Sequence, residues 1–210
     1  LLGNSLREAN IGAVFVMSGL LSLLPLPVIA WIEPDVCLAL IHIPLLVITG
    51  ILNLGIVWFY LKALSGDEPV AVVTYYNMVP VIALGLSYML LDESISQTQA
   101  IGMATILMGT SLLSIAIDNT QLFRHRTVGY MLLGCTCWAL ETVLLKKVAL
   151  EETMWQSLYW EQVTMAAFAL IVYKTIPSYR KSFHVMLARN RARTLALNTS
   201  NELLFMAANI

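Results

Sequence analysis

The chain has 210 residues, of which 59% are hydrophobic and only 12% are charged, and its formal net charge is −1. Soluble domains are typically about 45–50% apolar and about 25% charged, so this composition excludes both a disordered chain and a soluble domain. The nearly neutral charge provides no basic field for nucleic acid, and the apolar excess indicates an integral membrane protein.

Long apolar stretches follow one another along the whole chain. A helix that spans a bilayer needs about 20 mostly apolar residues. Six such stretches and part of a seventh are present, at residues 10–32, 36–62, 70–91, 99–117, 128–149, 153–176 and 194–210. Their short connections make neighbouring helices antiparallel. The sequence therefore predicts an all-α fold, a polytopic membrane helix bundle.

The first three spans contain prolines, namely Pro25, Pro27, Pro44 and Pro80. A proline within a helix removes a backbone hydrogen bond and clashes with the preceding turn. Membrane helices tolerate this when neighbouring groups satisfy the freed carbonyl. We therefore expect kinks or breaks in these helices.

Two glycines in the fourth span, Gly102 and Gly109, are seven residues apart and so share one helix face. Small residues let membrane helices approach closely. We expect this face to pack against another helix.

The positive charges are distributed unevenly about the predicted membrane. Ten of the twelve Lys and Arg residues lie at the N-terminus or after the second, fourth and sixth spans, and only Lys146 and Lys147 lie on the opposite side. Lys and Arg are enriched in cytoplasmic loops. This bias predicts that the first residues and the connection 177–193 are cytoplasmic.

A weak internal repeat links the second and seventh spans. Both begin with Leu-Ala-Leu, at 38–40 and 195–197, and both carry an Asn 14 or 15 residues after the first Leu, Asn53 and Asn209. Chance similarity between two apolar helices is the alternative explanation. A true repeat would be five helices long, and its second copy would be inverted in the membrane. Because the last span stops at Ile210 with no flanking loop, we expect the chain to be a fragment.

A set of short motifs occupies residues 54–114. They are Tyr60-Leu61-Lys62-Ala63-Leu64, Pro69-Val70-Ala71, Pro80, Asp92-Glu93-Ser94-Ile95, Gln99-Ala100-Ile101-Gly102 and Gly109. Together they resemble the end of an EamA repeat, the unit of the drug/metabolite transporter superfamily. Residues 129–147 are similar to the start of a second repeat.

The resemblance implies two inverted five-helix repeats, of which about 6.5 helices are present here. Residues 1–117 would be the first repeat without its first helix, 118–127 a linker, and 128–210 a truncated second repeat. It also implies a secondary transporter that moves small metabolites, such as amino acids or other small polar compounds, by alternating access. A cytoplasmic N-terminus is usual in the family and gives the orientation opposite to the charge bias, so the orientation stays open.

We expect a small-molecule substrate, a bilayer location in the plasma (inner) membrane, and no cofactor or nucleic acid; a homodimer is left open. The motifs of serine hydrolases, zinc proteases and P-loop proteins are missing from the sequence, so we do not expect an enzyme. A non-transporting sensor or scaffold built on the same helices is the alternative function.

Glu141 is the clearest candidate for a functional group within a span. An ionisable group there costs about 2.5–3.5 kcal/mol on insertion scales. Trp138 lies three residues earlier, on the same helix face. A carboxylate beside an indole suits a cation, an amine substrate or a proton. The alternative is a structural pairing of Glu141 with Lys146 or Lys147.

Further polar groups within the spans are candidate substrate-binding residues. They are Tyr75, Asn77, Asn53, Glu161, Asn198 and Glu202. Asn198 and Glu202 share a helix face. The alternatives are that Asn53 is a packing contact between helices and that Glu161 lies at the membrane interface. His42 is near the start of its span, and we expect it at the membrane interface.

Overall fold

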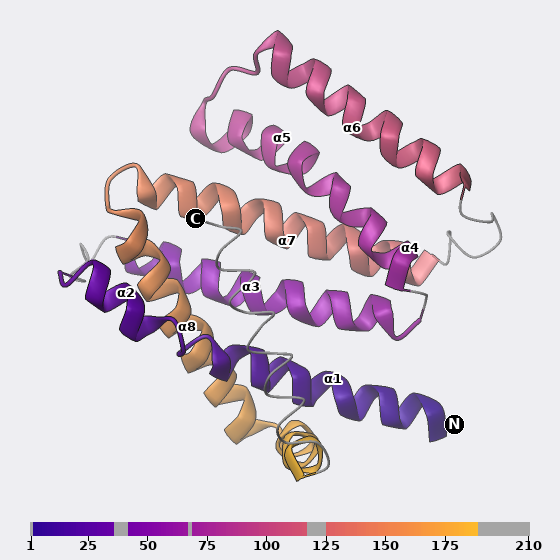
Figure 1. Ribbon diagram of the computed structural model, residues 1–210, viewed down its shortest axis with the longest axis vertical. Coiled ribbons are helices and arrows are strands. Elements are labelled where there is room, and N and C mark those ends of the chain that lie inside the picture. Colours follow the sequence, from indigo (N-terminus) through magenta and orange to yellow (C-terminus); the bar gives the residue numbers. More distant parts are fainter. Residues whose placement is uncertain (1, 36–41, 67–68, 117–124, 189–210) are drawn as a thin grey trace. The chain divides into compact units, whose positions relative to one another are not determined.

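The computed structural model describes residues 2–35, 42–66, 69–116 and 125–188, and within these ranges it contains helices and no strand (Figure 1). The helices are α1 (Leu2–Leu21), α2 (Leu26–Ile32), α3 (Ile43–Leu64), α4 (Pro69–Thr74), α5 (Val79–Leu91), α6 (Gln97–Ala116), α7 (His125–Ala149) and α8 (Met154–Thr175), with a 3₁₀ helix, η1 (Tyr75–Met78), between α4 and α5. Residues 177–188 are also helical. The all-α prediction is confirmed.

Four described stretches are long and apolar enough to cross a membrane, judged by length and composition: Ile11–Ile32, Ile43–Leu64, Val72–Leu91 and Arg126–Ala149. The other two complete spans expected from the sequence form α6 and α8, which are helical but not among these four. The predicted span 194–210 lies outside the described residues.

Two of the proline-containing spans are broken, as expected. The first span divides into α1 and α2, with Pro25 and Pro27 at the start of α2. The third divides into α4, η1 and α5, with Pro80 in the first turn of α5. Pro44 lies in the first turn of α3, which starts at Ile43 and runs unbroken to Leu64, and residues 36–41 of the same predicted span lie outside the described part of the chain. A proline in the first turn has no preceding helical turn to disturb.

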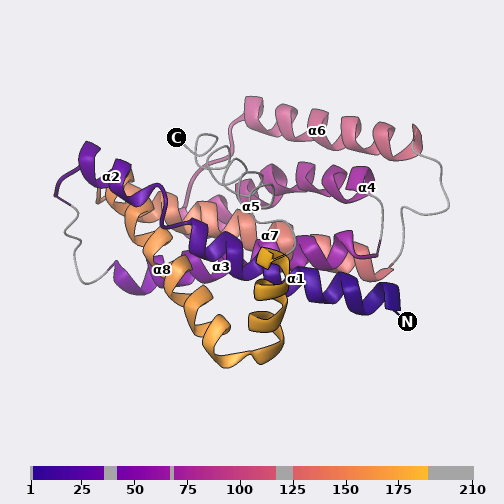
Figure 2. The ribbon, with the colours of Figure 1, turned by 60° about the horizontal axis from the view of Figure 1, so that its bottom comes forward.

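The chain divides into two compact units, one of residues 1–54 with 148–210 and the other of residues 55–147. In the first unit, α1 and α2 pack along α8 (Figure 2). The α1–α8 approach is close, since a Cβ at Gly19 would collide with the Cβ of Ala169. A Cβ at Gly50 of α3 would lie 2.9 Å from the Thr164 Cβ of α8. Glycine thus permits α8 to contact both helices closely.

The second unit has its own apolar core, formed by the buried residues Ala63, Val72, Met131 and Cys135. Both α4 and η1 pack against α6.

The packing role expected for Gly102 and Gly109 was wrong among the described residues, because a Cβ at either position would meet nothing within 4 Å. The half-buried residues of this part of α6 are Met103 and Leu107, one helical turn apart, so α6 turns a different face inward.

Candidate functional site

The first half of α8 is buried although it is polar. Its buried residues there include Gln156, Ser157, Glu161 and Gln162, and Glu161 is only 2% exposed. In a water-soluble helix the polar side would face outward, whereas polar residues in membrane helices face the protein interior. The chain therefore keeps a carboxylate within the packed helices of its first unit.

Asn53 and Glu161, two of the residues predicted from the sequence, come together in this unit. The Asn53 Nδ2 atom donates a hydrogen bond to Glu161 Oε1 over 3.2 Å, and Asn53 is 5% exposed. Gly50 lies one turn before Asn53 on α3, and a Cβ there would be 3.1 Å from the Glu161 carbonyl oxygen. The glycine thus allows α3 and α8 to lie close enough for the amide–carboxylate contact.

The break between α1 and α2 is also joined to α8. Ser22, which is buried, donates from its Oγ to the carbonyl oxygens of Gly19 at 2.8 Å and Gln162 at 3.0 Å. A carbonyl released from a helix within a bilayer needs such a donor. The polar face of α8 therefore supports a helix break as well as a carboxylate.

In the second unit, Glu141 of α7 is 4% exposed and accepts a hydrogen bond from Thr142 Oγ1 over 3.3 Å. Lys146, one of the structural partners considered for Glu141, pairs with Glu93, with 2.6 Å between Nζ and Oε1. This ion pair joins the α5–α6 connection to the last part of α7. Both of its side chains are exposed, whereas Glu141 is buried.

Aromatic side chains surround the break in the third span. The Tyr76 ring of η1 contacts the Trp138 ring edge-on, with 5.1 Å between the ring centroids. It also stacks on the Tyr60 ring, with 5.7 Å between the centroids. The Cys135 Sγ donates to the Tyr75 carbonyl oxygen over 3.3 Å, so part of the irregular backbone has a partner on α7. Non-helical backbone at membrane depth is tolerated where protein covers it or where it lines a cavity.

The predicted residues thus fall into two described groups. Asn53 and Glu161 belong to the first unit, and Glu141, Trp138, Tyr75 and Asn77 belong to the second. Asn77 is exposed, unlike the half-buried Tyr75. Asn198 and Glu202 lie outside the described residues.

The sequence analysis missed two contributions. Tyr76, not singled out among the site residues, is the η1 residue whose ring contacts Trp138. His42, taken as an interfacial residue, faces the carboxylates of Glu151 and Glu152. The sequence did hold a signal for this contact. His42 is near the start of the second span, and Glu151 and Glu152 lie in a connection on the same predicted side of the membrane. Within the described part of the chain, no group of three or more His, Cys, Asp or Glu side chains could hold a metal ion.

Comparison with known families decides the identity of this helix bundle. The model of the EamA-like transporter family matches residues 5–115, which is more than half of the chain. The chain belongs to the EamA-like transporter family. This confirms the resemblance found at residues 54–114 and places the chain in the drug/metabolite transporter superfamily. No curated protein and no solved structure gives a significant match.

As an EamA-like chain with apolar helices of spanning length, the protein is an integral membrane protein of the transporter type. A transporter of this kind has a small-molecule substrate and a lipid environment.

Proposed function

We propose that this EamA-like chain is part of a secondary transporter that moves small polar metabolites by alternating access. The observation that carries the proposal is the burial of a carboxylate in the middle of each of two long helices, Glu161 at 2% exposure and Glu141 at 4%. An intramembrane carboxylate is costly, and in transporters such groups bind substrates or relay protons.

The surroundings of Glu141 favour a substrate that carries a basic nitrogen, such as an amino acid. Trp138 lies one helical turn from Glu141 and contacts the Tyr76 ring of the broken third span. A carboxylate attracts a cationic nitrogen, and the face of an aromatic ring does so as well. Broken helices are also where transporters place substrate sites. Coupling to protons through Glu141 is part of this proposal.

The alternative function is a non-transporting sensor or scaffold. The Asn53–Glu161 hydrogen bond is the observation that favours it, because such bonds also serve as packing contacts between membrane helices. If the protein were a sensor or scaffold, it would carry no small molecule across the membrane, and the two carboxylates would serve only packing.

The test is uptake of radiolabelled amino acids by proteoliposomes that contain the complete protein. We expect uptake of at least one amino acid, and we expect Glu141→Gln to lower it by about 10-fold or more, or to change its dependence on pH between 5 and 8. Glutamine keeps the size of the side chain but cannot take up a proton.

The matched control is Glu93→Gln, which removes one carboxylate from the same unit at a side chain that is 40% exposed. Exposed ion pairs contribute only about 0–1 kcal/mol, so the control should retain its uptake. Unchanged uptake by Glu141→Gln across this pH range would remove Glu141 from the mechanism. No uptake of any amino acid by the unmodified protein would contradict the proposed substrate class, and no flux of any small metabolite would favour the sensor or scaffold.

A further inference from the structure

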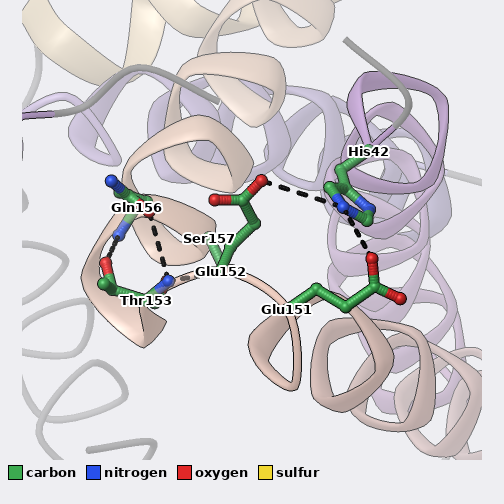
Figure 3. Close-up of polar contacts among 6 residues, drawn as sticks. All are labelled: His42, Glu151, Glu152, Thr153, Gln156 and Ser157. Carbon is green, nitrogen blue, oxygen red and sulfur yellow. Dashed lines mark hydrogen bonds and ion pairs between the residues drawn. The ribbon is translucent and has the colours of Figure 1, made fainter. Parts of the chain in front are cut away.

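His42 stands directly before α3 and is only 8% exposed (Figure 3). Its carbonyl oxygen accepts the N–H of Leu46, so the residue is fixed to the first turn of the helix. Two carboxylates face its Nε2 atom, with Glu151 Oε2 at 3.3 Å and Glu152 Oε1 at 3.7 Å. A buried imidazole thus lies between two acidic groups from another part of the chain.

The segment that carries these carboxylates has a fixed shape. The N–H groups of Glu151 and Glu152 both donate to the Val148 carbonyl oxygen, over 3.0 Å and 2.9 Å. On the other side of the pair, Thr153 and Gln156 form a capping box at the start of α8 (Figure 3). The end of α7 and the start of α8 therefore hold both carboxylates in position toward His42.

An uncharged hydrogen bond joins the same two regions. The Gln156 Nε2 atom donates to the Asp35 carbonyl oxygen over 2.7 Å. This bond keeps α8 attached to the chain that precedes α3 whatever the pH. The contact between His42 and the two carboxylates is the second attachment, and it is the one that involves ionisable groups.

We propose that His42, Glu151 and Glu152 form a proton-binding site that fastens the start of α3 to the α7–α8 connection when it is loaded. An imidazolium attracts both carboxylates, whereas a neutral imidazole donates at most one hydrogen bond from Nε2. A cation at a helix N-terminus is unfavourable, so the charged ring depends on these carboxylates. Histidine ordinarily changes its charge between pH 5 and 8, which makes it the natural proton acceptor.

Charged groups of both signs occur on the elements around the site. Lys146 and Lys147 end α7 just before the two carboxylates, and Lys146 pairs with Glu93. Glu33 and Asp35 precede α3, α2 carries no charged residue, and α3 has none before Lys62. On α8 the first charged residue is Glu161, which is bonded to Asn53.

The two carboxylates differ in their access to water. The side chain of Glu151 is 66% exposed, and that of Glu152 is 16% exposed. Glu151 therefore connects the buried imidazole with the aqueous phase, and Glu152 provides the more shielded charge.

The test measures the distance between spin labels in the complete protein in lipid nanodiscs at pH 5.5 and pH 8. Labels are attached at Val47→Cys on α3 and Leu150→Cys on the connection, both exposed, after the native cysteines Cys37, Cys135 and Cys137 are replaced by serine. We expect a narrow distance distribution at pH 5.5 that broadens severalfold at pH 8, because the loaded site holds the two elements together.

His42→Gln should remove this response to pH, and so should the double variant Glu151→Gln/Glu152→Gln. Glu33→Gln is the matched control, since it removes a carboxylate at the end of α2, away from His42 in the chain, and should preserve the response. A distribution that does not change with pH in the unmodified protein overturns the proposal, and so does equal loss of the response in Glu33→Gln. The measurement needs no substrate, so its failure and the failure of the transport proposal are separate results.

Discussion

At the scale of single residues, the contact between Asn53 and Glu161 explains why a carboxylate is stable within packed apolar helices. The amide donor lies 3.2 Å from a carboxylate oxygen, and both residues are at least 95% buried. A buried charge or hydroxyl without partners costs several kcal/mol, whereas a bonded one is tolerated. The residue pair thus contributes to packing as well as to the chemistry proposed for Glu161.

A double-mutant cycle of Asn53→Ala and Glu161→Gln separates these two contributions. Hydrogen bonds between membrane helices contribute about 0.6 kcal/mol on average and up to about 1.7 kcal/mol, so we expect a coupling free energy in that range. The measurement is the free energy of unfolding of each variant by steric trapping in bicelles. Additive effects of the two changes would show that the contact has no energetic weight.

At the scale of elements, α8 is the helix that organises the first unit. It packs against α1 and α2. Its Thr164 side chain and the carbonyl oxygen of Glu161 lie against Gly50 of α3. Its buried side is polar in the first half and apolar in the second, so both hydrogen bonds and close packing of small residues hold its neighbours, as is general for helices in lipid. Close backbone approach at glycines brings the donors and acceptors of those bonds within reach.

This packing predicts that Gly19→Ala destabilises the protein and that Gly102→Ala does not. A Cβ at Gly19 would collide with Ala169, and overpacking of this kind costs about 1–3 kcal/mol. Gly102 has nothing within 4 Å of a Cβ, and alanine improves helix propensity by about 1 kcal/mol. Thermal unfolding in detergent would compare the two variants, and a lower midpoint for Gly102→Ala than for Gly19→Ala would contradict the packing.

The sequence predicted the long described helices and two of the breaks because apolar length and proline position are local properties, but it took residues 177–188, which are helical, for part of a polar connection. For Pro44 the effect on a helix depends on where α3 starts, which an apolar run of residues 36–62 does not reveal. The pairing of Asn53 with Glu161 joins residues 108 positions apart, and the pairing of His42 with Glu151 is similarly distant. Such contacts depend on which helices pack together, and helical periodicity carries no information on that.

At the scale of the whole molecule, the arrangement of charges determines which aqueous phase each connection meets. The described basic residues after α8, Arg180 and Lys181, are exposed, as a polar connection requires. If the side with ten Lys and Arg residues is cytoplasmic, His42 and the α7–α8 connection face the exterior. The orientation usual in the family would place them in the cytoplasm, so orientation decides which side supplies the proton to His42.

Cysteine labelling in intact cells resolves this orientation. We expect Leu150→Cys, 70% exposed on the α7–α8 connection, to react with a membrane-impermeant maleimide added outside, because that side carries few positive charges. Ser178→Cys, in the basic segment after α8, should react only after the membrane is permeabilised. Both variants are made in a background without native cysteines, and total labelling in detergent serves as the control. Labelling of Ser178→Cys alone in intact cells would establish the orientation usual in the family and place the His42 site inside the cell.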